Sequence, residues 1–157
     1  MRNIKELSVG SFVSFFQPNG TQCICEVTEI RKAVIGLQIV DIVRNDVGDS
    51  PENDAKIGKE ILMPKGLVNR IGISDAFLRN LDFVDSDEKA WKCMYYFGDM
   101  RIYYKPDKQG FAVLKFKPDF TQKQWVRISC FYVNQLQNII RFLTGGELEF
   151  QYKTRQE

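Results

Sequence analysis

The sequence contains no histidine. Its absence excludes Ser-His-Asp and Cys-His catalysis, histidine-ligated zinc or iron, and the commonest general base near neutral pH. Any catalysis by these residues would have to use carboxylates, lysine, tyrosine or cysteine.

Long apolar runs are also lacking. No stretch approaches the roughly 18 consecutive apolar residues that are needed to span a bilayer. The opening residues, MRNIKELSVGSFV, include no apolar segment of the kind that signal peptides contain. We therefore expect a cytoplasmic protein without membrane contact.

Cysteine is scarce, with four residues and no C-x-x-C pair. Cys23 and Cys25 alternate along a predicted strand and so point to one face, which suits a core better than a disulfide. Zinc would need four well-spaced ligands. We expect buried thiols, no metal site and no cofactor.

Motifs of known enzyme chemistry are missing as well: there is no glycine-rich phosphate loop and no Gly-x-Ser-x-Gly. The acidic residues of the polar stretch 44–60 lack calcium-loop spacing. A charged connector accounts for a second acidic group, which consists of Asp82, Asp85, Asp87 and Glu88. We expect a protein that is not an enzyme, and we keep a carboxylate-dependent metal enzyme as an alternative.

The sequence does contain clear strand signals in residues 1–69. Apolar, β-branched stretches at 8–16, 22–30, 33–43 and 60–63 predict four short strands. QPNG, from Gln17 to Gly20, predicts the turn between the first two. Short strands with tight turns favour a small, strongly curved, barrel-like unit.

Residues 70–157 mix helix and strand signals. Ser74 is placed to cap a short helix, and Gly98-Asp99 predicts the tip of a hairpin over 91–105. Strands are expected at 110–117 and 123–129. An amphipathic helix follows, with Gly145 at its end and a last strand around Leu148. The predicted class is α+β: a β-rich, barrel-like N-terminal unit, then a mostly antiparallel sheet packed by a C-terminal amphipathic helix.

Positive charge is concentrated in residues 101–141, which hold 8 Lys and Arg against 2 Asp. Strand alternation sorts the second sheet into an apolar face, expected to lie under the closing helix, and a basic face with aromatic residues. We predict that this basic face binds a partner through Tyr96, Arg101, Tyr103, Lys115, Lys117, Trp125 and Arg127.

A basic face with interleaved aromatic rings is typical of platforms for single-stranded nucleic acid, because cations follow the phosphates while rings stack on bases. Two other interpretations stay open. In the first, the face is solvated or is covered by the N-terminal unit, since exposed strands often carry Lys and Arg. Alternatively, the chain is a protein-interaction module whose partner docks on the N-terminal unit or on a sheet edge.

The segment from Tyr132 to Phe150, YVNQLQNIIRFLTGGELEF, resembles the C-terminal signature of a family of small uncharacterised proteins from gut-bacterial genomes and mobile elements. The shared positions are Tyr132-Val133, Leu136-Gln137-Asn138, Leu143-Thr144-Gly145 and Glu147-Leu148-Glu149-Phe150. IKELSVGSFV and RIGISDAFLRNLDF are also similar to the family pattern. Asn134 stands where the family often has His, and prolines near Arg70 and Gly72 are missing. The family has no established activity, so the resemblance bears on the fold.

Overall fold

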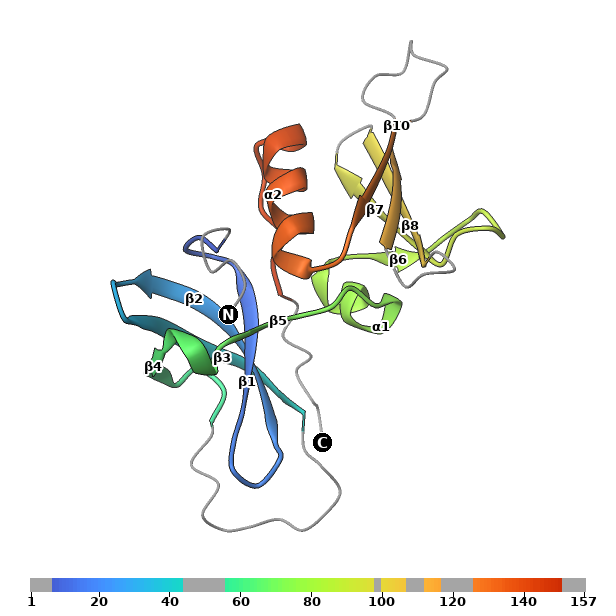
Figure 1. Cartoon of the computed structure of the whole chain (residues 1–157). Helices are drawn as coiled ribbons and strands as arrows, with labels where there is room; N and C mark the ends of the chain where they lie inside the picture. Colours follow the sequence, from blue (N-terminus) through green and yellow to red (C-terminus); the bar gives the residue numbers. More distant parts are fainter. Residues whose placement is uncertain (1–6, 44–55, 98–99, 107–111, 117–125, 151–157) are drawn as a thin grey trace. The chain divides into compact units, whose positions relative to one another are not determined.

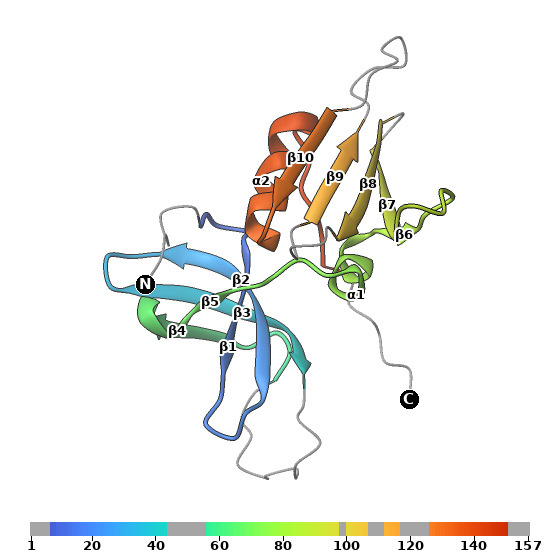
Figure 2. The same cartoon turned by 45° about the vertical axis from the view of Figure 1, so that its right-hand side comes forward.

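Figures 1 and 2 show the computed structural model of the chain, which describes residues 7–43, 56–97, 100–106, 112–116 and 126–150. At positions 97, 100, 112–116, 126–128 and 143 only the backbone is described. The chain divides into two compact units, residues 1–71 and 72–157. The sequence places this boundary between residues 69 and 70, whereas β5 (Asn69–Arg70) pairs with a strand of the first unit.

The first unit is a five-stranded antiparallel sheet in the order β4-β3-β2-β1-β5. Its strands are β1 (Phe12–Phe16), β2 (Gln22–Ile30), β3 (Val34–Val43) and β4 (Glu60–Pro64), with a 3-10 turn, η2 (Lys65–Leu67), before β5. The four predicted strands are confirmed. The predicted barrel is not closed: in the described part, β4 and β5 are the two edges and do not pair with each other.

Two irregularities in the pairing of β2 with β3 bend this sheet. The register shifts between Ile24 and Cys25 and again between Val27 and Glu29, and such bulges increase local twist. Gly36 lies opposite the second shift, where a Cβ would come within 3.0 Å of both Thr28 Oγ1 and Glu29 Cβ. The bent sheet encloses a core of Leu7, Val13, Phe15, Cys23, Cys25, Val27, Ile35, Leu37, Ile39 and Ile42.

The second unit contains a short helical segment, an antiparallel sheet and a longer helix. Its elements are α1 (Asp75–Leu78), η3 (Arg79–Leu81), β6 (Val84–Asp85), β7 (Cys93–Phe97), β8 (Met100–Pro106), β9 (Ala112–Phe116), β10 (Val126–Cys130) and α2 (Val133–Thr144). The sheet order is β10-β9-β8-β7-β6, so each strand pairs with its neighbour in sequence. The predicted α+β class is confirmed, and β6 is an additional strand. Gly98 and Asp99, the predicted hairpin tip, lie outside the described residues.

The closing helix buries the apolar stripe that the sequence predicts. Val133, Leu136 and Ile140 are fully buried, and α2 lies along one face of the second sheet, behind β10 in the view of Figure 2. Gly145 ends the helix in the left-handed conformation, with φ 70°, and its amide donates to the Arg141 carbonyl at 2.9 Å. The helix ends where the sequence predicts.

The predicted last strand is wrong for the residues that the structure describes. Residues 146–150 pair with no described strand. Their alternation serves packing instead, since Leu148 is buried and the Phe150 ring centroid lies 6.0 Å from that of Phe77. Tyr152, the third residue of the predicted strand, lies outside the described part. An alternating pattern of three residues therefore does not establish strand pairing.

No helix in the described ranges is long and apolar enough to cross a bilayer.

All four cysteines are buried free thiols, as the sequence predicts. Burial is the largest cause that raises the pKa of the Cys25, Cys93 and Cys130 thiols from 9.0 to about 12. Because the thiolate is the nucleophile, only about 1 in 10⁴ of such a buried thiol is ionised at pH 8 in the native protein. We expect negligible labelling of the native protein by a maleimide or disulfide reagent, and rapid labelling of four thiols in denaturant. Rapid native labelling of any one would contradict the buried placement.

Candidate nucleic-acid interface

Backbone register aligns five of the seven predicted binding residues on one face of the second sheet. Tyr96 pairs with Arg101 across β7 and β8, as the sequence predicts. Tyr103 pairs with Lys115 on β9, and Lys115 pairs with Arg127 on β10. Arg101 and Tyr103 are two residues apart on β8, so the two rows share a face, which we call the basic face.

The hairpin end of the basic face is open to solvent. Tyr96 is 46% exposed, and the Arg101 side chain is half exposed. The Arg101 guanidinium lies 5.4 Å from the centroid of the Tyr96 ring, which is a cation–π distance. An exposed ring and an exposed cation therefore lie next to each other on neighbouring strands.

Tyr103, in contrast, is buried, and the prediction that it offers an exposed ring is wrong. Only 1% of its surface is accessible, and it forms a small cluster with Met94 and Trp91. The Trp91 and Tyr103 ring centroids are 6.1 Å apart. Tyr103 therefore cannot stack on a base, although its hydroxyl still acts as a hydrogen-bond donor.

Trp91 also lies on a different face from the one that strand parity assigns to it. Alternation places Trp91 with Cys93 on the apolar face, but β7 begins only at Cys93. The indole instead packs on Tyr103, and Lys105 Nζ lies 4.7 Å from the centroid of its ring. Side chains alternate between faces only within an extended strand, and Trp91 precedes β7. The face that alternation predicts for Trp91 is therefore wrong.

The connector from Ser86 to Trp91 carries this tryptophan back over the basic face. Ser86 Oγ accepts from the Glu88 amide at 3.0 Å, and the Trp91 amide donates to the Glu88 carbonyl at 3.0 Å. These local hydrogen bonds fold the connector into a compact turn. From its charged residues, the sequence predicts only a solvated connector. The serine two positions before Glu88 is the one sequence signal of this turn.

Within this connector, Asp87 contacts two residues of β8. Its Oδ1 accepts from the Tyr103 hydroxyl at 3.0 Å, and its Oδ2 lies 3.3 Å from Arg101 Nη1. Burial raises the pKa of Tyr103 above its usual 10.0, so the hydroxyl keeps its proton and can donate. The hydrogen bond with Tyr103 is the largest cause that raises the pKa of Arg101, whose side chain stays a cation.

The remaining predicted site residues are placed by backbone alone or not at all. Lys115 and Arg127 occupy the register positions given above, and their side chains are not described. Lys117 and Trp125 lie outside the described residues. The structure thus brings together Tyr96, Arg101 and Tyr103 in side-chain detail.

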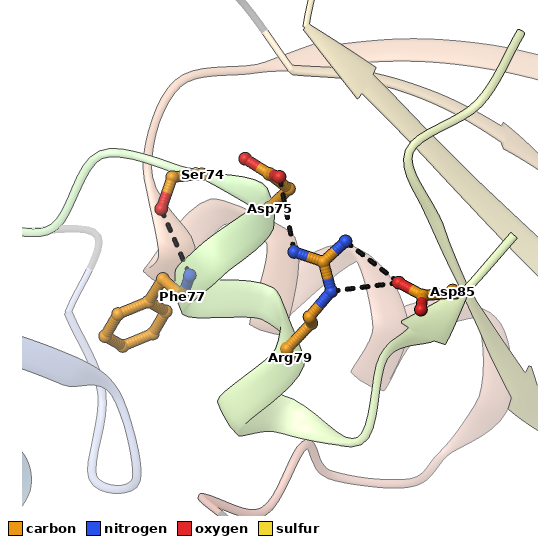
Figure 3. Close-up of polar contacts among 5 residues, drawn as sticks. All are labelled: Ser74, Asp75, Phe77, Arg79 and Asp85. Carbon is orange, nitrogen blue, oxygen red and sulfur yellow. Dashed lines mark hydrogen bonds and ion pairs between the residues drawn. The ribbon is translucent and has the colours of Figure 1, made fainter.

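A second polar cluster joins α1 to β6, as Figure 3 shows. Ser74 caps α1 as predicted, with its hydroxyl accepting from the Phe77 amide at 3.1 Å. The Arg79 guanidinium lies 2.9 Å from Asp85 and 3.3 Å from Asp75. These exposed ion pairs give Asp75 and Asp85 a cationic partner within the chain.

The alternative of a carboxylate-dependent metal enzyme requires a group of metal ligands, and the described ranges contain none. No cluster of three or more Cys, Asp or Glu there could hold a metal ion. Asp85 and Asp87 face different arginines, Arg79 and Arg101. The acidic residues of the 44–60 stretch, Asp46, Asp49, Glu52 and Asp54, lie outside the described part.

Comparison of the chain with protein-family models, with curated proteins and with solved structures finds no match. The family resemblance of the C-terminal segment therefore stays a prediction.

Proposed function

We propose that this protein is a non-catalytic binding protein that contacts single-stranded nucleic acid through the basic face. The observation that supports this best is the register, which aligns Arg101 with Tyr96 and Lys115 with Arg127 across four adjacent strands. Cations at these positions would neutralise phosphates, and the exposed Tyr96 ring would stack on a base.

The dimensions of the sheet suit a short stretch of strand. Neighbouring strands lie about 4.8 Å apart, so the rows from β7 to β10 extend over about 14 Å. A flat strand surface leaves bases free to lie against rings, whereas a duplex hides them inside its stack. Single-stranded ligands are therefore favoured over duplex.

Binding of a fluorescent single-stranded oligonucleotide, followed by anisotropy at several salt concentrations, tests the proposal. Three phosphate contacts give a slope of about −2 in log K against log salt. Tyr96→Ala is expected to weaken binding about tenfold through lost stacking. Arg101→Ala should weaken binding and make the slope shallower by about 0.7.

Arg79→Ala is the matched control, because it removes the same charge from the same unit at a cluster away from the basic face. Its affinity should stay within about twofold of the original protein, since only long-range electrostatics change. Equal losses for Arg79→Ala and Arg101→Ala would mean that net charge alone drives binding. No binding at low salt would remove the proposed function.

A protein partner is the second candidate, and the β4 edge of the first unit is the surface that favours it. β4 pairs only with β3 in the described part, and its Leu62 is exposed. Beside it is a pocket of about 240 Å³, lined by Phe15, Gln17, Ile39, Lys59, Ile61, Leu62 and Met63. An extended peptide could add to such an edge and place a side chain in such a pocket.

A further inference from the structure

One carboxylate holds two hydrogen-bond donors of the basic face. Asp87 accepts from the Tyr103 hydroxyl at 3.0 Å through one oxygen and lies 3.3 Å from Arg101 Nη1 through the other. Arg101 is 14 residues and Tyr103 16 residues along the chain from Asp87, so the fold creates this arrangement. A guanidinium beside a hydroxyl is a donor set that also suits phosphate oxygens.

We infer that Arg101 and Tyr103 form a subsite for one phosphodiester group, and that Asp87 occupies this subsite until the ligand's phosphate displaces its carboxylate. The inference rests on the proposed function and names the chemical group that this part of the face recognises. Asp87 acts as an internal competitor. Apparent affinity is then reduced by the fraction of molecules in which Asp87 blocks the donors.

The exchange requires only a small movement. Both Asp87 and Arg101 are about half exposed, so a phosphate can approach the ion pair from solvent and replace the carboxylate. The connector is fixed on both sides of Asp87 by the Ser86 turn and by the packed Trp91 ring. Rotation of the Asp87 side chain frees the subsite while the turn and the cluster stay in place.

Asp87→Asn tests the subsite directly, because the amide keeps an acceptor for the Tyr103 hydroxyl and loses the charge that competes with phosphate. The matched control is Asp85→Asn, which changes net charge equally but faces Arg79. At low salt we expect Asp87→Asn to bind a labelled single-stranded oligonucleotide about tenfold more tightly than the original protein. Asp85→Asn should gain less than about twofold.

Two further measurements separate the subsite from a structural role of Asp87. The salt slope of Asp87→Asn should match that of the original protein, because the bound complex makes the same phosphate contacts in both. Adding Tyr103→Phe to Asp87→Asn should remove about threefold of the gain, because one donor to the phosphate is lost. Asp87→Ser, checked by thermal melting, provides a second reading if the asparagine variant does not fold.

The possible failures are distinguishable. If the original protein and Asp87→Asn bind equally, the subsite is overturned and the proposed function stands. Equal gains for Asp85→Asn and Asp87→Asn also overturn the subsite, because net charge then explains the effect. If neither the original protein nor any variant binds at low salt, both the subsite and the proposed function are overturned.

Discussion

Replacing Leu136 with alanine is expected to lower the free energy of unfolding of the second unit by about 3 kcal/mol, within the 2–5 kcal/mol typical of large-to-small core changes. Leu136 is fully buried on the face of α2 that also carries Val133 and Ile140. The substitution removes apolar contacts and leaves a cavity that the helix can fill only partly. Urea denaturation followed by tryptophan fluorescence measures this, because both tryptophans, Trp91 and Trp125, lie in the second unit.

Phe142→Ala is the control on the same helix. Phe142 is 90% exposed, so its removal should change the free energy of unfolding by no more than about 0.5 kcal/mol. A loss from Phe142→Ala as large as that from Leu136→Ala would show that α2 is rotated about its axis from the orientation described here.

Replacing Trp91 with alanine should cost about 3 kcal/mol of stability, at the lower end of the range for buried aromatic residues. Trp91 lies over Tyr103 and Met94 and also receives Lys105 on its ring. Its loss exposes the Tyr103 ring and frees one end of the connector that carries Asp87. Denaturation followed by circular dichroism is the suitable measurement, because the substitution removes one of the two fluorescent probes.

Trp91→Phe provides the comparison, since a smaller ring still covers part of Tyr103, and it should recover about half of the loss. Hydrogen exchange adds a local readout: the Glu88 amide, which donates to Ser86 Oγ in the same turn, should exchange faster in Trp91→Ala. A Trp91→Ala protein as stable as the original would mean that the tryptophan does not pack on this face.

The two basic-face experiments depend on this packing in different ways. Tyr96 and Arg101 are already exposed with Trp91 in place, so we expect them to stay exposed in Trp91→Ala. The Asp87 contacts, in contrast, require the connector to be held near β8. Trp91→Ala is therefore expected to disturb the contacts of Asp87 while leaving Tyr96 and Arg101 available for binding.

Structural features that depend on residues close together in the sequence were predictable. Hairpin pairing of Tyr96 with Arg101 follows from a two-residue tip at Gly98-Asp99, and the buried stripe of α2 follows from helical spacing. The serine cap of α1 and the left-handed Gly145 follow from the conformations and hydrogen bonds that these residues favour. Each depends on side chains a few positions apart.

Features that depend on distant segments were not predictable. The two-residue strands β5 and β6 have no period to detect, and they exist because β1 and β7 offer free edges to them. Nor does the sequence predict that β4 and β5 stay unpaired with each other at the two edges of the first sheet. The spacing of residues along the chain does not indicate which strand edges pair in the folded sheet.

For the candidate site, the sequence alone predicts that Tyr96, Arg101 and Tyr103 share a face of the second sheet, because alternation along a paired strand is a property of the backbone. Which part of that face is covered depends on how the connector packs on it. The connector from Ser86 to Trp91 folds back, buries Tyr103 and brings Asp87 to Arg101. This cover is set by packing between segments more than ten residues apart, and no local pattern encodes such packing.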